Sequence, residues 1–593
     1  MKALGLLFLL MYLGPLAAGE AGAKPTKATA QPVQAKQVRA KPVLPKSVYF
    51  GDLHMHSGFS LNAAGFLTMN RPHELYRFAR GEKIKHTVLG YVQLETPLDF
   101  AAVTDHPAYF GLMSAIFDKR NPHFVSNIAA EFRKGSARTR KAVEEHLYGD
   151  SLVPEAMRAD AAFIAGAADV WEEIVRAADE ADQHEAFTAF VGYSWRHVRP
   201  RENGLAGLHR NVIFKGAAPL LPWDSFHYRG PEALWARMEA FRARGAGDVI
   251  AIPVNVHLSG GWMYAARKDD GLPFDAAYAR RRAHNEPLMQ IMQSRGASET
   301  HTALARNDAS ADFELLPPDA LLLGGPSGDP TDAATGYARE GLKHGLKHAA
   351  ELGHNPFKHG FVGSTGTHNA TPGRTLEQGY GGHHGIIDNT APERLQDRPH
   401  DNPGALTAVW ATANSRAAIF EALRRRETYA TSGTRLRVRF FGGWDLDAQA
   451  HRRPDMVHYG YSQGVSMGAD LPQPGPAAKE PVFVIWAYCD TDSAMLDRVQ
   501  VVKGWLDQGE IKEKVFTDVV VAADNTTCEL RGTWRDPAFD KNQAAFYYLR
   551  VLEKPVKRWS AYQEERTGLD SGKPKMIQER AWTSPIWYTP AAR

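Results

Sequence analysis

Two histidines one residue apart, His54 and His56, end a short apolar run that comprises Val48, Tyr49 and Phe50. Alternate residues of a strand project from one face, so both imidazoles would point the same way at the strand terminus. Imidazole nitrogens are common metal ligands, so the pair supplies half of a predicted metal site. A single His-x-His is more often a pair of surface histidines, and the metal site therefore needs further ligands elsewhere in the chain.

Polar residues recur where later apolar runs end. Runs at 98–103, 248–257, 287–292 and 360–364 alternate with helical patterns such as 169–184. Because the chemistry of α/β barrels collects at the C-terminal ends of the strands, we expect these polar residues to share one site. The strand-end residues are His54, His56, Asp105, His106, His257, Glu299 and His368, whereas His209 begins its run at 208–214.

The apolar patterns divide the chain into two folded parts. Strands that alternate with helices predict an α/β domain with a mostly parallel sheet over residues 47–434, closed by a helix at 417–426. From Leu436 onward, β-like runs at 436–441, 481–486, 498–503 and 544–551 predict a C-terminal antiparallel β-sandwich-like domain over 435–593. The Gly-, His- and Pro-rich residues 369–402 are expected to form a long loop beside the site.

The N-terminal 46 residues have a different composition. Residues 1–23 resemble a secretory signal peptide without a lipid-anchoring cysteine, and residues 24–46 form a basic, Pro- and Ala-rich leader predicted to be disordered. No later apolar run is long enough to span a bilayer. We therefore expect an exported protein, periplasmic or secreted, without a transmembrane segment in its mature chain.

The net charge bears on possible binding partners, and the cysteines bear on disulfide formation. The chain carries +3 overall, but residues 2–46 hold seven basic and one acidic side chain, so residues 47–593 sum to −3. This charge gives no reason to expect nucleic acid as a partner. The two cysteines, Cys489 and Cys528, form either a disulfide in an oxidising compartment or two separate buried thiols.

The motifs resemble those of a known superfamily. The sequence Asp52-Leu-His-Met-His-Ser57 with Thr104-Asp-His106 looks like the polymerase and histidinol phosphatase (PHP) superfamily. More closely, the chain is similar to a bacterial family of unknown function related to that superfamily. The segments that carry this closer resemblance are 208–214, 363–369, 425–433, 437–444, 500–506 and 577–582. Together they extend from about residue 48 to residue 590.

This resemblance implies a distorted (β/α)7 barrel that holds divalent metals and hydrolyses phosphate esters. It implies a ligand set of His54, His56, His106, His209, His257 and His368, with Glu299 as a carboxylate near the site. Asp105 would bind metal or orient His106. The resemblance implies Zn or Mn, with Fe as a further candidate, and one or two ions. Among these metals, an imidazole-rich set favours Zn.

Three positions depart from the superfamily pattern. Asn62, Ser194 and Gly366 stand where related sequences carry carboxylates. Carboxylates bridge adjacent metal ions and offset the repulsion between them, so their loss should weaken a multi-metal cluster more than a single ion.

The leading hypothesis is therefore hydrolysis of a small-molecule phosphate mono- or diester by a metal-activated water. Arg210, beside His209, is the first candidate to bind phosphate oxygens, and Arg196 and Arg295 follow. His383 or His384 could protonate the leaving group, although a polar glycine-rich loop is the better explanation for both. The alternatives are a degenerate metal- or ligand-binding homologue without turnover and a hydrolase of a non-phosphate ester or amide.

Overall fold

The computed structural model describes residues 44–134, 155–201, 204–317, 321, 333–476 and 478–591. Residues 43–593 form one compact unit. The predicted signal peptide and nearly all of the predicted leader lie outside the described residues. No helix among the described residues has the length and apolar character needed to span a membrane.

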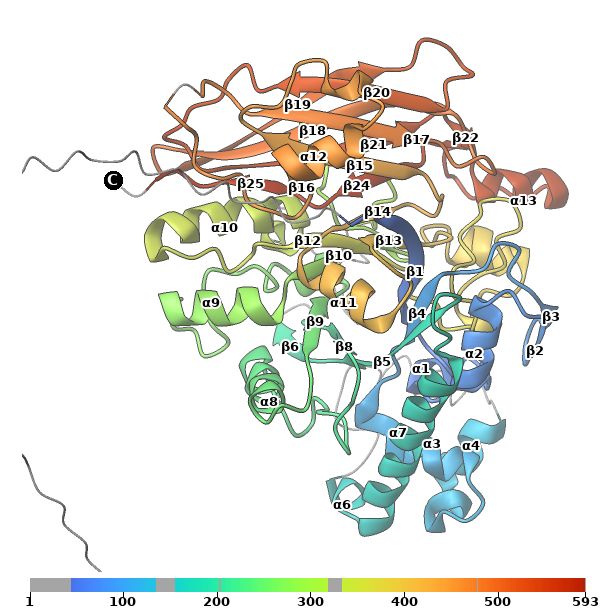
Figure 1. Ribbon diagram of the computed structural model, residues 1–593. Coiled ribbons are helices and arrows are strands. Elements are labelled where there is room, and N and C mark those ends of the chain that lie inside the picture. The colour runs from blue at the N-terminus through green and yellow to red at the C-terminus, as the bar shows by residue number, and fades with distance from the viewer. Residues whose placement is uncertain are drawn as a thin grey trace, which may run out of the picture. The chain divides into compact units, whose positions relative to one another are not determined.

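A twelve-stranded mixed sheet forms the centre of this unit (Figure 1). Its strands lie in the order β19 (Glu510–Val521), β18 (Leu496–Asp507), β21 (Ala545–Glu553), β24 (Arg580–Thr583), β14 (Thr428–Thr431), β13 (Leu406–Ala411), β1 (Ser47–Met55), β4 (Phe100–Val103), β5 (Thr188–Trp195), β8 (Arg210–Phe214) and β9 (Val249–Pro253), with β25 (Ile586–Tyr588) beside β21. Buried apolar side chains fill both faces of β4, β5 and β9, as expected for strands inside a covered sheet.

The predicted mostly parallel sheet is wrong in part, because only the β1–β4 and β4–β5 pairs of the large sheet are parallel among the described strands. The chain leaves β5 through the hairpin of β6 (Val198–Arg201) and β7 (Gly204–Gly207) and returns antiparallel as β8. A hairpin reverses the chain direction, whereas a parallel neighbour requires a longer crossover.

The predicted barrel is not closed by hydrogen bonds among the described strands. β10 (Leu288–Gln293), β11 (Gly296–Ala297) and β12 (Gly360–Gly363) form a separate three-stranded sheet, and β9 is an edge of the large one.

Helices cover the outer face of the site-bearing strands. The remaining elements are α1 (Leu61–Gly65), α2 (Pro72–Ala79), β2 (Ile84–His86), β3 (Gly90–Val92), α3 (Phe110–Phe117), α4 (Asn127–Lys134), α6 (Glu155–Arg158), α7 (Ala161–Ala181), α8 (Pro231–Ala243), α9 (Ala276–Asn285), α10 (Ala338–Leu352), α11 (Arg416–Arg424), α12 (Met456–Gln463), α13 (Trp559–Thr567), β22 (Val556–Lys557) and β23 (Met576–Ile577). The helix predicted over 169–184 corresponds to the second half of α7. Asp160 caps the N-terminus of α7, because its carboxylate accepts hydrogen bonds from the backbone of Ala162 and Phe163.

From β15 (Arg437–Gly443) onward the strands are antiparallel, as predicted. β15, β16 (Val465–Ser466), β17 (Val482–Tyr488) and β20 (Glu529–Arg535) form a four-stranded layer. This layer packs on the C-terminal strands of the large sheet, with the rings of Phe483 and Tyr547 4.8 Å apart. The structure joins Cys489 and Cys528 in a disulfide, with 4.9 Å between the Cα atoms.

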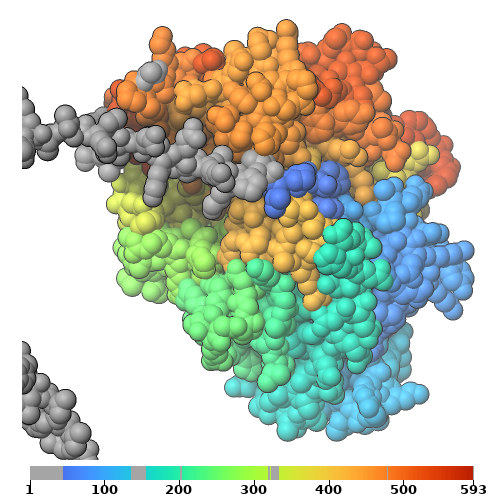
Figure 2. Space-filling view, viewed as in Figure 1, coloured from blue at the N-terminus to red at the C-terminus, as the bar shows by residue number. Residues whose placement is uncertain are grey.

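The large sheet continues across the boundary predicted at residue 434. β14 pairs with β24, which lies about 150 residues later in the chain, in the register Tyr429–Thr583 and Thr431–Ala581. Figure 2 shows the orange and red surface of the C-terminal strands in direct contact with the surface of the preceding region. One sheet therefore serves both predicted domains.

A buried ionic cluster ties the two regions together. We use this name for Glu299, Asp308, Arg339 and Arg550, whose side chains are all buried. Arg339 lies 2.7 Å from Glu299 and 2.8 Å from Asp308. Arg550, on β21, lies 2.6 Å from Asp308 and 3.2 Å from Glu299.

A pair of glutamates lies where the 369–402 segment meets β24. Burial raises the pKa of Glu377 to about 8, and burial together with Glu377 raises the pKa of Glu579 well above its usual range. When the pKa of a carboxyl group rises on folding, the folded protein loses stability as the pH increases. The loss occurs between the pKa of the group in the unfolded chain, near 4.5, and its pKa in the folded protein. We expect Glu377→Gln, which cannot ionise, to be more stable than the wild type by an amount that grows from pH 5 to pH 8.5 and reaches on the order of a few kcal/mol.

Thermal unfolding at these two pH values tests the expectation. The exposed Glu565→Gln serves as the control, because its wild-type side chain is 64% exposed. An equal effect of Glu377→Gln at both pH values would contradict the argument.

Candidate functional site

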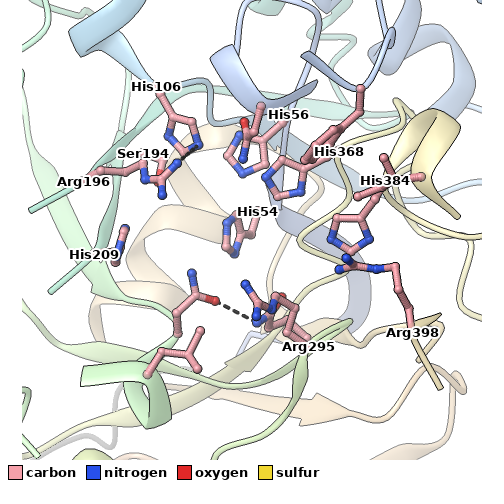
Figure 3. A pocket seen from close by; sticks show the side chains of 16 residues that line it. His54, His56, His106, Ser194, Arg196, His209, Arg295, His368, His384 and Arg398 are labelled. Atoms are coloured by element: carbon pink, nitrogen blue, oxygen red, sulfur yellow. Dashed lines mark hydrogen bonds between the residues drawn. The ribbon is translucent and has the colours of Figure 1, made fainter. Parts of the chain in front are cut away.

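A cavity of about 200 Å³ opens at the ends of β1, β4, β5 and β9 (Figure 3). Its lining contains six histidines and three arginines: His54, His56, His106, His209, His368, His384, Arg196, Arg295 and Arg398. None of the sixteen described residues that line it is a carboxylate.

Strand pairing brings the first histidines together. β1 and β4 run parallel, so their C-terminal ends lie at the same edge and place His56 beside His106. The segment after β12 then joins the end of β1, because the amide of His56 donates to Thr367 O at 2.8 Å and that of Gly366 donates to His54 O at 2.8 Å. This pairing places His368 next to His56.

His56, His106 and His368 form a compact group, with one ring nitrogen of each within 4.8 Å of the other two. The ring of His56 lies 4.5 Å from that of His106 and 4.1 Å from that of His368, measured between centroids. Three imidazoles that converge in this way match the three-histidine ligand set of catalytic zinc sites, which leave a fourth position open.

Hydrogen bonds behind the group orient His56. Its Nδ1 lies 2.9 Å from Ser60 Oγ, which donates to Asp105 Oδ1 at 2.7 Å. Asp105 also accepts from the amide and the hydroxyl of Ser57. Because Ser60 uses its proton on Asp105, His56 Nδ1 must be the donor, which leaves Nε2 as the lone-pair nitrogen on the cavity side. Asp105 acts on His56 through Ser60 and does not line the cavity.

We expect Asp105→Asn to weaken metal binding about 10–100-fold, since outer-shell partners of metal-ligating histidines have effects of this size. The amide cannot accept from Ser57 and Ser60 as the carboxylate does, so the tautomer of His56 is no longer fixed. Competition with a chromophoric zinc chelator measures the affinity. Asp99→Asn, at a carboxylate that caps the amide of Phe50 away from the cavity, is the matched control. Unchanged affinity in Asp105→Asn would contradict this role.

The histidines are in the form that metals bind. Burial, reinforced by neighbouring cationic side chains and histidines, holds the pKa of His56, His106, His209 and His368 well below the usual value. Burial lowers the pKa of His54 to about 4. His209 Nε2 and His368 Nδ1 are buried and have no hydrogen-bond partner among the described residues. Neutral imidazoles with unused nitrogens fit a divalent cation.

Four predicted site residues do not line the cavity: Asp105, which acts on His56 and not on His106 as predicted, and Arg210, Glu299 and His257. Arg210 follows His209 on β8 and projects from the opposite face, where its Nε donates to the buried Glu286 at 2.8 Å. Glu299 belongs to the buried ionic cluster. His257 lies in a short 3₁₀ turn after β9, and both of its nitrogens are engaged: Nδ1 with Ser298 Oγ at 2.6 Å and Nε2 with Arg295 O at 3.2 Å.

The three altered positions surround the group as the resemblance implies. Asn62 and Ser194 line the cavity. Gly366 has a φ of +62°, and a Cβ atom there would lie 2.5 Å from Gln293 Oε1. A carboxylate side chain at Gly366 would therefore need both a left-handed backbone and a displaced glutamine.

The 369–402 segment contributes more than the sequence indicated. It supplies His384, Ile387 and Arg398 to the cavity lining. His384 Nδ1 lies 3.2 Å from Asp388 Oδ2 and 3.4 Å from Asp401 Oδ2, a second His–carboxylate group next to the first. Arg398 was not predicted, because no local pattern marks one arginine in a loop as functional.

Comparisons with known proteins place the chain in a family. It matches the model of a protein family of unknown function, DUF3604, over residues 43–529 and 520–590, and it belongs to that family. The predicted membership in a family of unknown function is thus confirmed. No curated protein matches the chain significantly. One similar crystal structure is that of a two-domain protein from Bacteroides vulgatus containing a predicted PHP-like metal-dependent phosphoesterase. The two sequences are 12% identical, the match covers 87% of this chain and 94% of the other chain, and the TM-score is 0.27.

Proposed function

We propose that this DUF3604 protein is a metal-dependent hydrolase of phosphate esters. The observation that carries the proposal is the group of His56, His106 and His368, which converges on a cavity that also receives Arg196 and Arg295. Imidazoles without carboxylates suit zinc or iron best, because manganese, like magnesium and calcium, prefers oxygen ligands. Guanidinium groups match phosphate oxygens in geometry and charge.

The residues present divide the chemistry between them. A divalent ion held by the three histidines would supply a water with a pKa near 7 and would polarise the phosphoryl oxygen. Asp105 and Ser60 fix the tautomer of His56. Arg196 lies 3.3 Å from His106 Nε2, so its guanidinium can bind a phosphate oxygen beside the histidine group. The orphaned His209 Nε2 is available as a further ligand, which allows one or two ions.

We also propose that the fold is a distorted relative of the seven-stranded PHP barrel. β1, β4, β5, β8 and β9 lie in this order in the large sheet, and β10 and β12 pack beside β9 and β14. Seven strands would then surround the cavity, although hydrogen bonds do not join them all.

A second candidate function is metal or anion binding without turnover. Asn62 and Ser194 favour it, because the cavity lining then has no carboxylate to bridge two ions or to act as a general base. The third reading, hydrolysis of a non-phosphate ester or amide, uses the same histidines. A sulfate ester would also bind to the cavity arginines, whereas an amide or carboxylic ester gives them no anionic group to bind.

Metal analysis of the purified protein, combined with an activity panel, tests the proposal. The panel comprises p-nitrophenyl phosphate, bis-p-nitrophenyl phosphate, p-nitrophenyl sulfate and p-nitrophenyl acetate. We expect bound zinc, manganese or iron, and hydrolysis of a phosphate ester that a chelator removes and the metal restores. Metal-free protein after metal supplementation would overturn the proposal. Stoichiometric metal without turnover of any substrate would favour the binding protein.

A further inference from the structure

We propose that Arg295 and Arg398 form a clamp for a dianionic phosphate group, so that the substrate is a small phosphate monoester and not a diester. This inference rests on the proposed function and deepens it. The observation behind it is an excess of positive charge in the cavity, with two guanidinium groups on the side away from His106 (Figure 3).

The described lining holds three arginines and no carboxylate. Asp401 lies behind the lining and pairs with Arg398, which offsets one of these positive charges and leaves the arginines in excess. A bound divalent ion would add two more charges. A diester monoanion would leave most of this charge unbalanced in a partly closed cavity, whereas a monoester dianion offsets it further and offers three terminal oxygens.

The backbone around Arg295 is fixed, and its side chain has no acidic partner. It lies in the tight turn between β10 and β11, where Gln293 pairs with Gly296. His257 holds the two sides of this turn through its contacts with Arg295 O and Ser298 Oγ. Arg295 Nε is buried without a hydrogen-bond partner, and no described carboxylate forms an ion pair with Arg295. An anion is the missing partner of such a group.

Asp401 fixes the position of the Arg398 side chain. Its Nε donates to Asp401 Oδ2 at 2.6 Å, and Asp401 is buried beside His384. The hydrogen bond through Nε leaves the two outer nitrogens for the cavity, and Figure 3 shows the guanidinium group directed toward Arg295. Asp401 offsets only one of the two guanidinium charges, so an anion that binds to both arginines would offset the charge that remains.

The size of the cavity supports a small substrate. Pockets for drug-sized ligands measure about 300–1,000 Å³, and this one holds about 200 Å³. A phosphate with one short substituent is of a size that fits this volume.

Calorimetric binding of methyl phosphate and dimethyl phosphate to the zinc-loaded protein at pH 8 tests the clamp. At this pH methyl phosphate is a dianion, because its second pKa is near 6, and dimethyl phosphate is a monoanion of similar size. We expect the wild type to bind methyl phosphate at least about tenfold more tightly, and Arg295→Met and Arg398→Met each to reduce this preference about tenfold.

Arg120→Met is the matched control, since Arg120 is 88% exposed and pairs with Asp118 at the surface. Equal binding of the two esters by the wild type, or an undiminished preference in both clamp variants, would overturn the clamp. Metal content is measured on every sample, so failure to hold zinc counts against the proposed function and remains distinct from failure of the clamp. Circular dichroism confirms that each variant is folded, and the conservative Arg295→Lys should keep more of the preference than Arg295→Met.

Discussion

Replacement of His56 by alanine is expected to remove the bound metal and to lower kcat/KM by more than the 10–100-fold that loss of an outer-shell partner costs. His56 lies at the centre of the histidine group, with its ring next to those of both His106 and His368. Without it, the two remaining imidazoles cannot complete a three-ligand set. Elemental analysis of the purified variant, together with phosphate-ester turnover, gives the two measurements.

His227→Ala provides the control for His56→Ala. The side chain of His227 is 64% exposed and pairs with Asp224 outside the cavity, so its loss should leave metal content and turnover unchanged. A His56→Ala protein that keeps its full metal content would show that the metal is held elsewhere. In that case the second group, His384 with Asp388 and Asp401, would be the first place to look.

Replacement of Arg550 by methionine is expected to destabilise the protein by about 3–5 kcal/mol, the cost of removing one partner from a buried charge network. Glu299 and Asp308 would then share Arg339 alone, in a region from which water is excluded. The same change removes the ion pairs between β21 and the segment that follows β11, and only the hydrogen bond from Tyr548 to Glu299 still joins this strand to the cluster carboxylates. Urea unfolding, followed by tryptophan fluorescence, measures the loss.

The control for Arg550→Met is Arg498→Met, on the neighbouring strand β18. Arg498 is 38% exposed and pairs with Asp497 and Asp518 at the surface, so its loss should cost at most about 1 kcal/mol. The metal content of Arg550→Met carries separate information. A folded variant that loses metal would restore Glu299 as a ligand candidate, whereas unchanged metal content supports its structural role.

The sequence was sufficient to find the histidine group, because its members end strands or begin the segments that follow them. His54 and His56 share a strand face, and parallel pairing of β1 with β4 brings His106 to the same edge. His368 follows the end of a later apolar run, motif resemblance added His209 as a ligand candidate, and the structure places both at the cavity. Short-range periodicity is enough for such positions, since the end of a strand fixes where its side chains lie.

Glu299, Arg210 and His257 could not be placed from the sequence, because long-range contacts decide their positions. Glu299 is drawn to Arg339 and Arg550, which lie 40 and 251 residues away. A left-handed Asn255 directs the chain after β9, so that His257 supports the turn that carries Arg295. The antiparallel direction of β8 could not be predicted either, because the β6–β7 hairpin that reverses the chain gave only a weak pattern in the sequence.

The continuous sheet has a consequence for how this chain folds. β1 begins at residue 47 and pairs with β13, which ends at residue 411, and β14 in turn needs β24 near residue 580. The histidine-bearing edge therefore cannot be completed until almost the whole chain has been synthesised. Such contacts between distant residues slow folding, and a fragment that ends at residue 434 would expose β14 as an unpaired edge prone to aggregation. The histidine-bearing region and the C-terminal strands should therefore be produced, exchanged and engineered as one piece.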